Sequence, residues 1–222
     1  MTLRHPIHPF TVRTLAGCAL PALLVVGSIV AGVRAQDVPL APVAIDSARI
    51  SIAGTSNIHP YTASTTAIHV TRAQLATGAG TATWEAMLKP GALEAFDVTI
   101  AAATLTSPRE GLDANMHKAL NVEQFPEITF RLRRIDGAAD AQTAVGVLRI
   151  AGVDREVTLA IHTERKNAAL VVKGELRLLM TDFGITPPKA LMGMLKTDPK
   201  VTVTFEAALA IPARVTTSAF KH

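Results

Sequence analysis

The sequence predicts an all-β fold: an antiparallel, eight-stranded barrel with a short helical insertion. Apolar and polar side chains alternate in segment after segment, which is typical of strands with one buried face and one face in water. Turn sequences such as Lys89-Pro90-Gly91 and Asp136-Gly137 separate these segments. About eight antiparallel strands in one domain must also hide their edges, and closing the sheet into a barrel does this.

The strands are clearest in the second half of the chain. Six segments carry the alternation plainly, at residues 96–100, 128–133, 143–150, 157–162, 170–180 and 201–209. In the last of them, Val201, Val203 and Phe205 fall on one face and Thr202 and Thr204 on the other. Weaker segments near 49–53, 61–70 and 80–88 bring the count to eight or nine strands.

Two stretches break the alternation and predict helical structure. Leu112, Met116 and Leu120 recur at helical spacing within residues 110–121. This stretch is the expected helical insertion, long enough to cover part of a barrel. Residues 189–195 suggest a single helical turn.

The N-terminal stretch is expected to be an export signal. Arg4 and Arg13 form a positive flank, and residues 14–33 carry no charged side chain. The run ends in Val33-Arg34-Ala35, a pattern that a signal peptidase reads, so we expect cleavage after Ala35 and a periplasmic or secreted protein. Two alternatives stay open: an uncleaved membrane anchor, because the uncharged run is long enough to span a bilayer, and a lipobox ending at Cys18.

The predicted organisation is therefore a signal peptide at 1–35, a flexible lead at 36–44, one barrel domain at 45–212 and a tail at 213–222. The chain has 22 Lys and Arg, and loss of Arg4, Arg13 and Arg34 leaves 19 against 18 acids, a net charge of +1. Such a balance lacks the basic surface that nucleic-acid binding requires.

Catalysis is not expected. Cys18 is the only cysteine, so the mature chain offers no disulfide and no thiolate nucleophile. His59, His69, His117 and His162 are scattered without the short spacings of zinc sites, and no Gly-x-Ser-x-Gly turn is present. We therefore expect no catalytic residue, no metal site and no cofactor.

Several short segments occur in an order that resembles the YceI-like family across nearly the whole mature chain. They are ISIAGTS at 50–56 followed by His59, LDANM at 112–116, FPEITF at 125–130, GVLRIAG at 146–152, TDFGI at 181–185 and VTVTF at 201–205. The resemblance implies a lipocalin-like barrel, exported from the cytoplasm, that sequesters a polyisoprenoid, quinone-like or fatty-acyl chain without catalysis. Pro60 and Tyr61 depart from the bulky apolar residue expected soon after the histidine, which leaves the local pocket shape open.

On this basis we expect inward apolar side chains to line a ligand cavity. The candidates are Trp84, Phe96, Met116, Leu120, Ile128, Phe130, Leu148, Leu178, Met180 and Phe205. Plain core packing is the alternative for each. Small residues are frequent in the strands, which favours a cavity, although an alanine-rich composition would produce the same frequency without one.

Polar residues near predicted turns and helix ends are the candidates for head-group binding. They are His59, Tyr61, Asp113, Asn115, His117 and Asp182. Asp113 could instead accept hydrogen bonds at its helix start, and Asp182 could organise a turn.

The expected partner is a lipid or isoprenoid small molecule. Membrane contact is expected only for ligand exchange, or through an uncleaved N-terminal segment, and a homodimer is left open. The alternative function is a periplasmic stress or interaction module whose barrel is filled by side chains.

Overall fold

The computed structural model describes residues 43–76, 83–138, 141–190, 192 and 194–211. The predicted signal peptide at 1–35, its cleavage site, nearly all of the lead and the tail at 213–222 lie outside the described residues. The chain divides into two units, 1–37 and 38–222, and the second contains every described residue.

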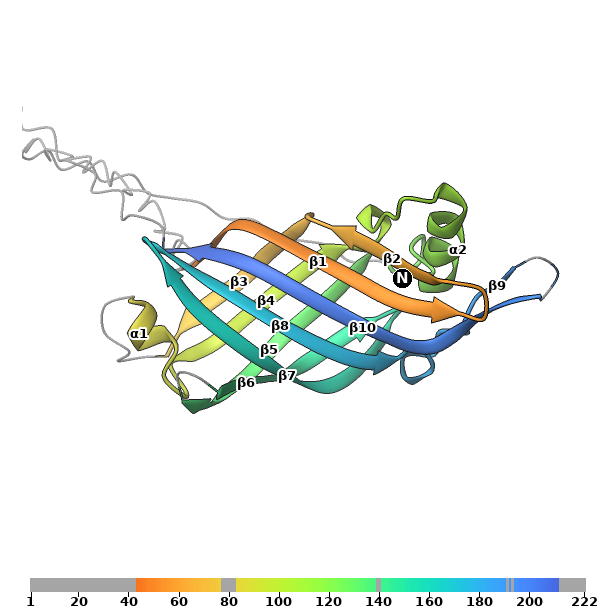
Figure 1. Ribbon diagram of the computed structural model, residues 1–222. Helices are drawn as coiled ribbons and strands as arrows, with labels where there is room; N and C mark the ends of the chain where they lie inside the picture. The colour runs from red at the N-terminus through yellow and green to blue at the C-terminus, as the bar shows by residue number, and fades with distance from the viewer. Residues whose placement is uncertain (1–42, 77–82, 139–140, 191, 193, 212–222) are drawn as a thin grey trace, which may run out of the picture. The chain divides into compact units, whose positions relative to one another are not determined.

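The described chain forms one antiparallel sheet that curls into a barrel (Figure 1). Its strands are β1 (Ala44–Ser56), β2 (Pro60–Thr65), β3 (Ile68–Leu75), β4 (Leu93–Ala101), β5 (Glu127–Ala138), β6 (Ala141–Ile150), β7 (Val153–Lys166), β8 (Ala169–Leu179), β9 (Lys189–Ala190) and β10 (Leu195–Ala210). Their order is β2-β1-β10-β8-β7-β6-β5-β4-β3, with β9 paired to β10 outside this path. The predicted all-β barrel is confirmed.

The main path holds nine strands among the described residues, the upper end of the eight or nine counted in the sequence and one more than the predicted eight-stranded barrel. The expected strand at 61–70 is in fact β2 and β3, separated by Thr66 and Ala67. The Thr65 hydroxyl accepts the Ala67 N–H at 3.0 Å, a local bond that competes with strand pairing and breaks the strand there. Because β2 and β3 are the two ends of the strand order, this short link also joins those ends.

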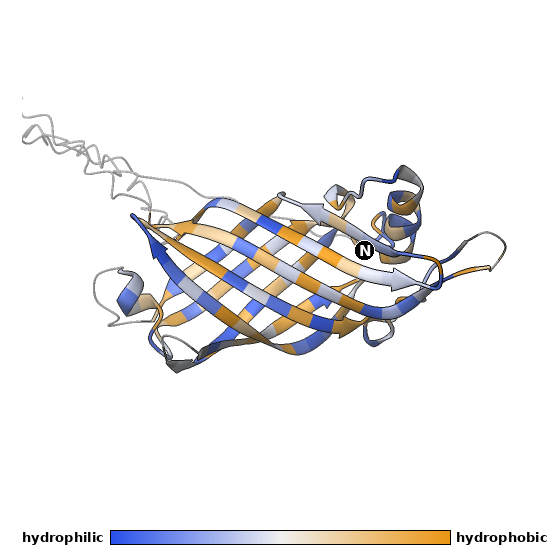
Figure 2. Ribbon diagram, viewed as in Figure 1, coloured by the Kyte–Doolittle hydropathy of each residue, from blue (hydrophilic) through white to orange (hydrophobic). Residues whose placement is uncertain are grey.

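The apolar and polar alternation of the sequence corresponds to the inward and outward side chains of the strands. Figure 2 shows apolar and polar residues in turn along β10, β8 and β7. In β10, Val201 is buried and Glu206 is exposed, and Val203 pairs with Leu176 of β8. The inward faces build a core with one cluster near each end of the barrel and a third between them.

The predicted helical insertion is α2 (Glu110–Leu120). It ends at Asn121, whose φ of 50° is left-handed, and the Asn121 N–H bonds back to carbonyls of the last turn. Two short 3-10 helices, η1 (Ala102–Thr104) and η2 (Met180–Phe183), were not anticipated. No helix in the described ranges is long and apolar enough to cross a membrane.

One local prediction was wrong and another holds only in part. Residues 84–87 form a helical turn, α1 (Trp84–Met87), in place of the end of a strand. The reason is tertiary: Trp84 and Met87 both bury their side chains, and the Trp84 indole N–H donates to the Ala168 carbonyl at 3.0 Å. The expected helical turn at 189–195 holds only in part: Met192 has 3-10 helical conformation, but the stretch begins and ends in strand because β9 pairs antiparallel with the start of β10.

Candidate functional site

A cavity of about 670 Å³ lies inside the barrel at the end covered by α2. Its wall consists of inward side chains of the strands, among them Ile52, Ile128, Ile150, Leu178, Val201 and Val203. These residues are apolar because each occupies the buried phase of its strand alternation. Polar groups contribute little to this wall below the rim.

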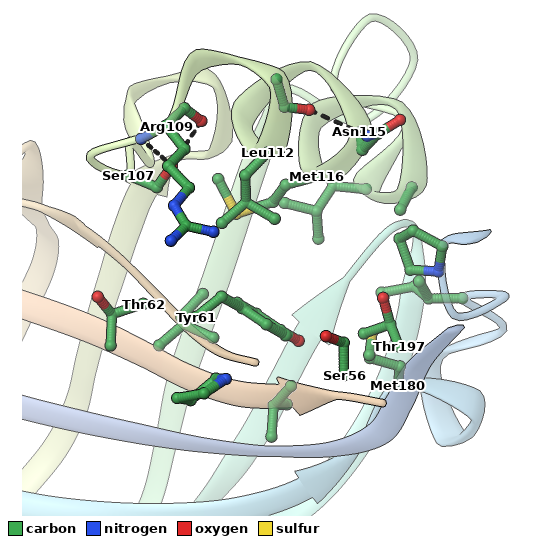
Figure 3. A pocket seen from close by; sticks show the side chains of 18 of the residues that line it. Ser56, Tyr61, Thr62, Ser107, Arg109, Leu112, Asn115, Met116, Met180 and Thr197 are labelled. Atoms are coloured by element: carbon green, nitrogen blue, oxygen red, sulfur yellow. Dashed lines mark hydrogen bonds between the residues drawn. The ribbon is translucent and has the colours of Figure 1, made fainter. Parts of the chain in front are cut away.

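The helix α2 roofs this cavity. Leu112, Met116, Ala119 and Leu120 line it, at spacings that put them on one helix face. Figure 3 shows Leu112 and Met116 pointing from the helix toward the strands below. The roof is thus an apolar lid of adaptable side chains, with methionine well suited to irregular contacts.

Polar side chains gather at the rim where α2 begins. The Arg109 guanidinium donates to His59 Nε2 at 2.7 Å, and His59 Nδ1 lies 3.2 Å from the Pro60 carbonyl. With a proton on Nδ1, the His59 ring can donate to the Pro60 carbonyl and accept from Arg109 at Nε2. Among the described side chains, the ion pairs do not include Arg109.

Tyr61 lies on the opposite side of the rim from Arg109 (Figure 3). Its ring covers Gly54, its partner across the β1–β2 ladder, so closely that a Cβ at position 54 would collide with the ring and hydroxyl. Burial, and to a lesser extent the Asp198 carboxylate, raise the pKa of Tyr61. The hydroxyl therefore stays protonated and remains a hydrogen-bond donor through the physiological range.

The close contact over Gly54 makes a testable prediction. Gly54→Ala should push the Tyr61 ring away from β1 toward solvent, and the pKa of Tyr61 should fall toward its ordinary value because burial is lost. Tyr61 is the only tyrosine of the chain, so tyrosinate absorbance during a pH titration reports on it alone. Asp198→Asn should lower the pKa by a smaller amount, and Asp154→Asn, on β7 where the carboxylate pairs with Arg131 and Arg149, should leave it unchanged.

A second, smaller cavity of about 130 Å³ occupies the α1 end of the barrel. Its lining is apolar apart from Thr163 and includes Trp84, Met87, Phe96, Phe130 and Phe205. It shares no lining residue with the larger cavity.

A layer of side chains divides the two cavities. On β6, Ile150 lines the larger cavity and Ala144 the smaller one, while Leu148 between them lines neither. On β8, Leu176 occupies the same intermediate level between Leu178 and Val172. We call this layer, with the rings of Phe130 and Phe205 beside it, the partition.

Glycines make room for the two partition rings. A Cβ at Gly146 would meet the Phe130 ring, and a Cβ at Gly174 would meet the Phe205 ring. The rings therefore lie against the wall over glycines, which leaves the large cavity above them open.

Residues 44–209 match the family model described as the YceI-like domain, from the start of β1 nearly to the end of β10. The chain belongs to the YceI-like family. No curated protein matches the sequence.

Solved structures share the fold of this YceI-like domain. BcnA of Burkholderia cenocepacia has a TM-score of 0.58 and 14% identity, over 73% of this chain and 96% of that one. A polyisoprenoid-binding domain from Saccharophagus degradans, implicated in plant cell wall breakdown, has a TM-score of 0.57 and 12% identity, over 78% of this chain and 100% of its own. At these identities the likeness concerns the fold.

Nine of the ten apolar candidates divide between the two cavities of the YceI-like domain. Met116, Leu120, Ile128, Leu178 and Met180 line the larger one. Trp84, Phe96, Phe130 and Phe205 line the smaller one. Leu148 lines neither and belongs to the partition, because its level in the barrel is filled by side chains. Ligand contact by any of them stays a prediction.

The six polar candidates also divide. His59, Tyr61 and Asn115 reach the rim of the large cavity. Asp113, His117 and Asp182 lie outside its lining, and head-group binding by any of the six stays a prediction.

Three local contacts explain this placement. The Asp113 carboxylate accepts the Ser107 N–H at 2.8 Å, just before α2. His117 donates from Nε2 to the Leu105 carbonyl at 2.8 Å. Asp182 is exposed on η2, where its carbonyl accepts from Arg155 at 2.8 Å. The first two contacts tie α2 to the segment before it, which is the structural alternative for Asp113 and His117.

Arg109 is the rim residue that the sequence did not reveal. It lies 50 residues from His59 and no motif links the two. The one sequence feature that points to this position is Ser107, a residue type typical of helix starts. Its hydroxyl accepts the Arg109 N–H at 3.1 Å and donates to the Arg109 carbonyl at 2.8 Å. Among the described residues, no group of three or more His, Cys, Asp or Glu side chains could hold a metal.

Proposed function

We propose that this YceI-like domain is an exported carrier that binds one lipid, with its chain in the large cavity and an acidic head group at Arg109. The observation that carries the proposal is an open, apolar cavity of about 670 Å³ beneath a polar rim. A barrel filled by its own side chains, as the interaction-module alternative requires, would not leave this space.

The cavity volume bounds the ligand. A cavity of about 150 Å³ holds benzene, or about 25 Å³ per carbon, so the large cavity of about 670 Å³ has room for at most about 27 carbons. A long fatty-acyl chain or an isoprenoid of four or five units is within this limit. Each buried CH₂ contributes about 0.8 kcal/mol, so a chain of this length outweighs the several kcal/mol that binding costs in lost freedom.

The rim favours an anionic head group. Arg109 donates one N–H to the His59 imidazole and has further N–H donors for a carboxylate or phosphate, which its planar guanidinium binds in bidentate fashion. The Tyr61 hydroxyl supplies a further donor across the rim, since the raised pKa keeps it protonated. Ser56 and Thr197 also line this part of the cavity.

The fold supports the same reading. The Saccharophagus degradans domain with this fold is described as polyisoprenoid binding, and such a ligand is long and apolar. Export is part of the proposal and depends on the N-terminal pattern that ends at Ala35. N-terminal sequencing of the protein recovered from its native compartment should begin at Gln36.

Mass spectrometry of organic extracts from the natively purified protein tests the main proposal. We expect one acidic isoprenoid or acyl compound per chain, absent from a control in which the protein is denatured and washed before extraction. An empty extract, together with no binding of long-chain acids in titration, would favour the interaction module.

The single tryptophan reports how deep the ligand reaches. Trp84 lines the small cavity beyond the partition, so a chain of 20 carbons or fewer in the large cavity should leave Trp84 fluorescence unchanged. Binding is measured in parallel by displacement of a radiolabelled fatty acid. A large spectral shift with such a chain would place the ligand across the partition and contradict the assignment of the two cavities.

A further inference from the structure

Exposed apolar side chains gather at one place on this domain. Among the described residues, three large hydrophobic side chains are exposed: Ile58, Met194 and Met192, with exposed fractions of 56%, 67% and 102%. Ile58 lies in the turn between β1 and β2, and the two methionines lie between β9 and β10. We call these three side chains the mouth tip.

Hydrogen bonds from Asn57 connect the two loops that carry the mouth tip. The Asn57 side chain donates to the Met194 carbonyl and accepts the Lys196 N–H, each at 2.8 Å. The Asn57 N–H donates to the Lys196 carbonyl at 3.0 Å. These bonds therefore hold the loop that carries Ile58 beside the loop that carries the two methionines.

The mouth tip borders the large cavity. Ser56 and His59, on either side of Ile58 along the chain, line that cavity. Leu195 and Thr197, which follow Met194, line it as well. An apolar surface in contact with the mouth tip is thus next to the opening through which a chain would pass.

The charges around the mouth tip favour an anionic surface. The segment 188–200 carries Lys189, Lys196 and Lys200 against the single acid Asp198. All three lysines are exposed. Flexible apolar side chains surrounded by lysines are typical of surfaces that rest in the interface of an anionic bilayer.

We propose that the mouth tip inserts into the interface of an anionic lipid bilayer, so that the ligand passes between bilayer and cavity without crossing water. This inference rests on the proposed function for its purpose, since a lipid ligand must come from a membrane. A bilayer fits better than a protein groove because the tip combines unbranched methionine side chains with dispersed cations and presents no preformed shape.

Vesicle flotation tests the proposal with the full-length mature protein. Wild type should float with vesicles of phosphatidylcholine and phosphatidylglycerol and much less with phosphatidylcholine alone. The combined variant Ile58→Thr, Met192→Gln and Met194→Gln should lose at least about tenfold in partitioning, because it removes all three apolar contacts.

A matched pair of lysine variants tests the charge. Lys189→Gln should reduce partitioning about fivefold, the effect of one cation near an anionic surface. Lys166→Gln removes the same charge from the β7–β8 hairpin, which lies at the α1 end near Trp84, and should change nothing. Equal losses in both variants, or flotation of the combined variant at the wild-type level, would overturn the proposal.

Two further measurements separate this proposal from its rivals and from the proposed function. Binding of a detergent-dispersed long-chain acid should survive in the combined variant, and its loss would show that the tip belongs to the ligand site and not to a docking surface. If wild type floats but binds no lipid ligand, the carrier function fails while bilayer docking stands. A dimer in sedimentation that the combined variant abolishes would assign the tip to a second copy of the chain.

Discussion

Phe130→Ala is expected to lengthen the chain that the barrel accepts by about ten carbons. The ring belongs to the partition and lines the smaller cavity, of about 130 Å³, so its truncation should open that cavity toward the larger one. The small cavity alone has room for about five carbons, and the vacated ring adds a similar space. The affinity optimum in a series of fatty acids or prenyl acids should move to longer chains.

The same substitution should cost stability. Removal of a packed phenylalanine ring typically costs about 3 to 5 kcal/mol, and the lower end applies here because one face of the ring already borders a cavity. Urea unfolding measures the loss, and Phe205→Ala provides an independent opening of the partition if Phe130→Ala folds poorly. Trp84 fluorescence should now respond to long chains in either variant.

The matched control for the partition is Phe183→Leu. Phe183 is buried in the core cluster near α2 and lines neither cavity. Its truncation should lower stability without changing the preferred chain length. A shift in chain length in this control as well would mean that general loosening of the barrel, and not the partition, sets the limit.

Arg109→Gln is expected to weaken binding of acidic lipids by about 10- to 100-fold while leaving the matching alcohols unaffected. A charge-assisted hydrogen bond contributes about 1.5 to 3 kcal/mol, and Arg109 is the cation that lines the large cavity. Arg109→Lys should give an intermediate loss, because it keeps the charge but not the planar fork. Displacement titrations with acid and alcohol pairs of equal chain length measure these differences.

The rim is exposed, so the Arg109 effect should shrink as salt concentration rises. Arg133→Gln removes the same charge from an exposed position on β5 and is the control. If acids and alcohols lose affinity equally in Arg109→Gln, Arg109 supports the shape of the rim and does not bind the head group.

Much of the fold could be predicted because the alternation of apolar and polar residues shows which side chains of a strand face inward. The alternation in 201–209 placed Val203 and Phe205 correctly on the inner face, and the spacing of Leu112, Met116 and Leu120 identified the face of α2 that roofs the cavity. Period-two and period-3.6 patterns report on one element at a time, and that was sufficient for barrel and helix.

Depth along the barrel was not predictable in this way. Phe130 and Ile128 both face inward on β5, yet they line different cavities, and the inward Leu148 of β6 lines neither. The level at which an inward residue lies depends on strand register, which a single strand does not encode. The Arg109 contact with His59 could not be predicted either. It joins the start of α2 to the turn between β1 and β2, and patterns within one element do not report contacts between two elements.

The Ser64–Thr106 bridge has a consequence for behaviour at high concentration. The Ser64 N–H donates to the Thr106 carbonyl at 2.8 Å and the Thr106 N–H returns to Ser64 at 3.1 Å, so the loop before α2 covers the outer edge of β2. Pro60, at the start of that strand, has no N–H to offer. An uncovered strand edge invites pairing with another molecule and growth into fibrils. The loop that joins α2 to the edge of β2 therefore also protects the protein from aggregation.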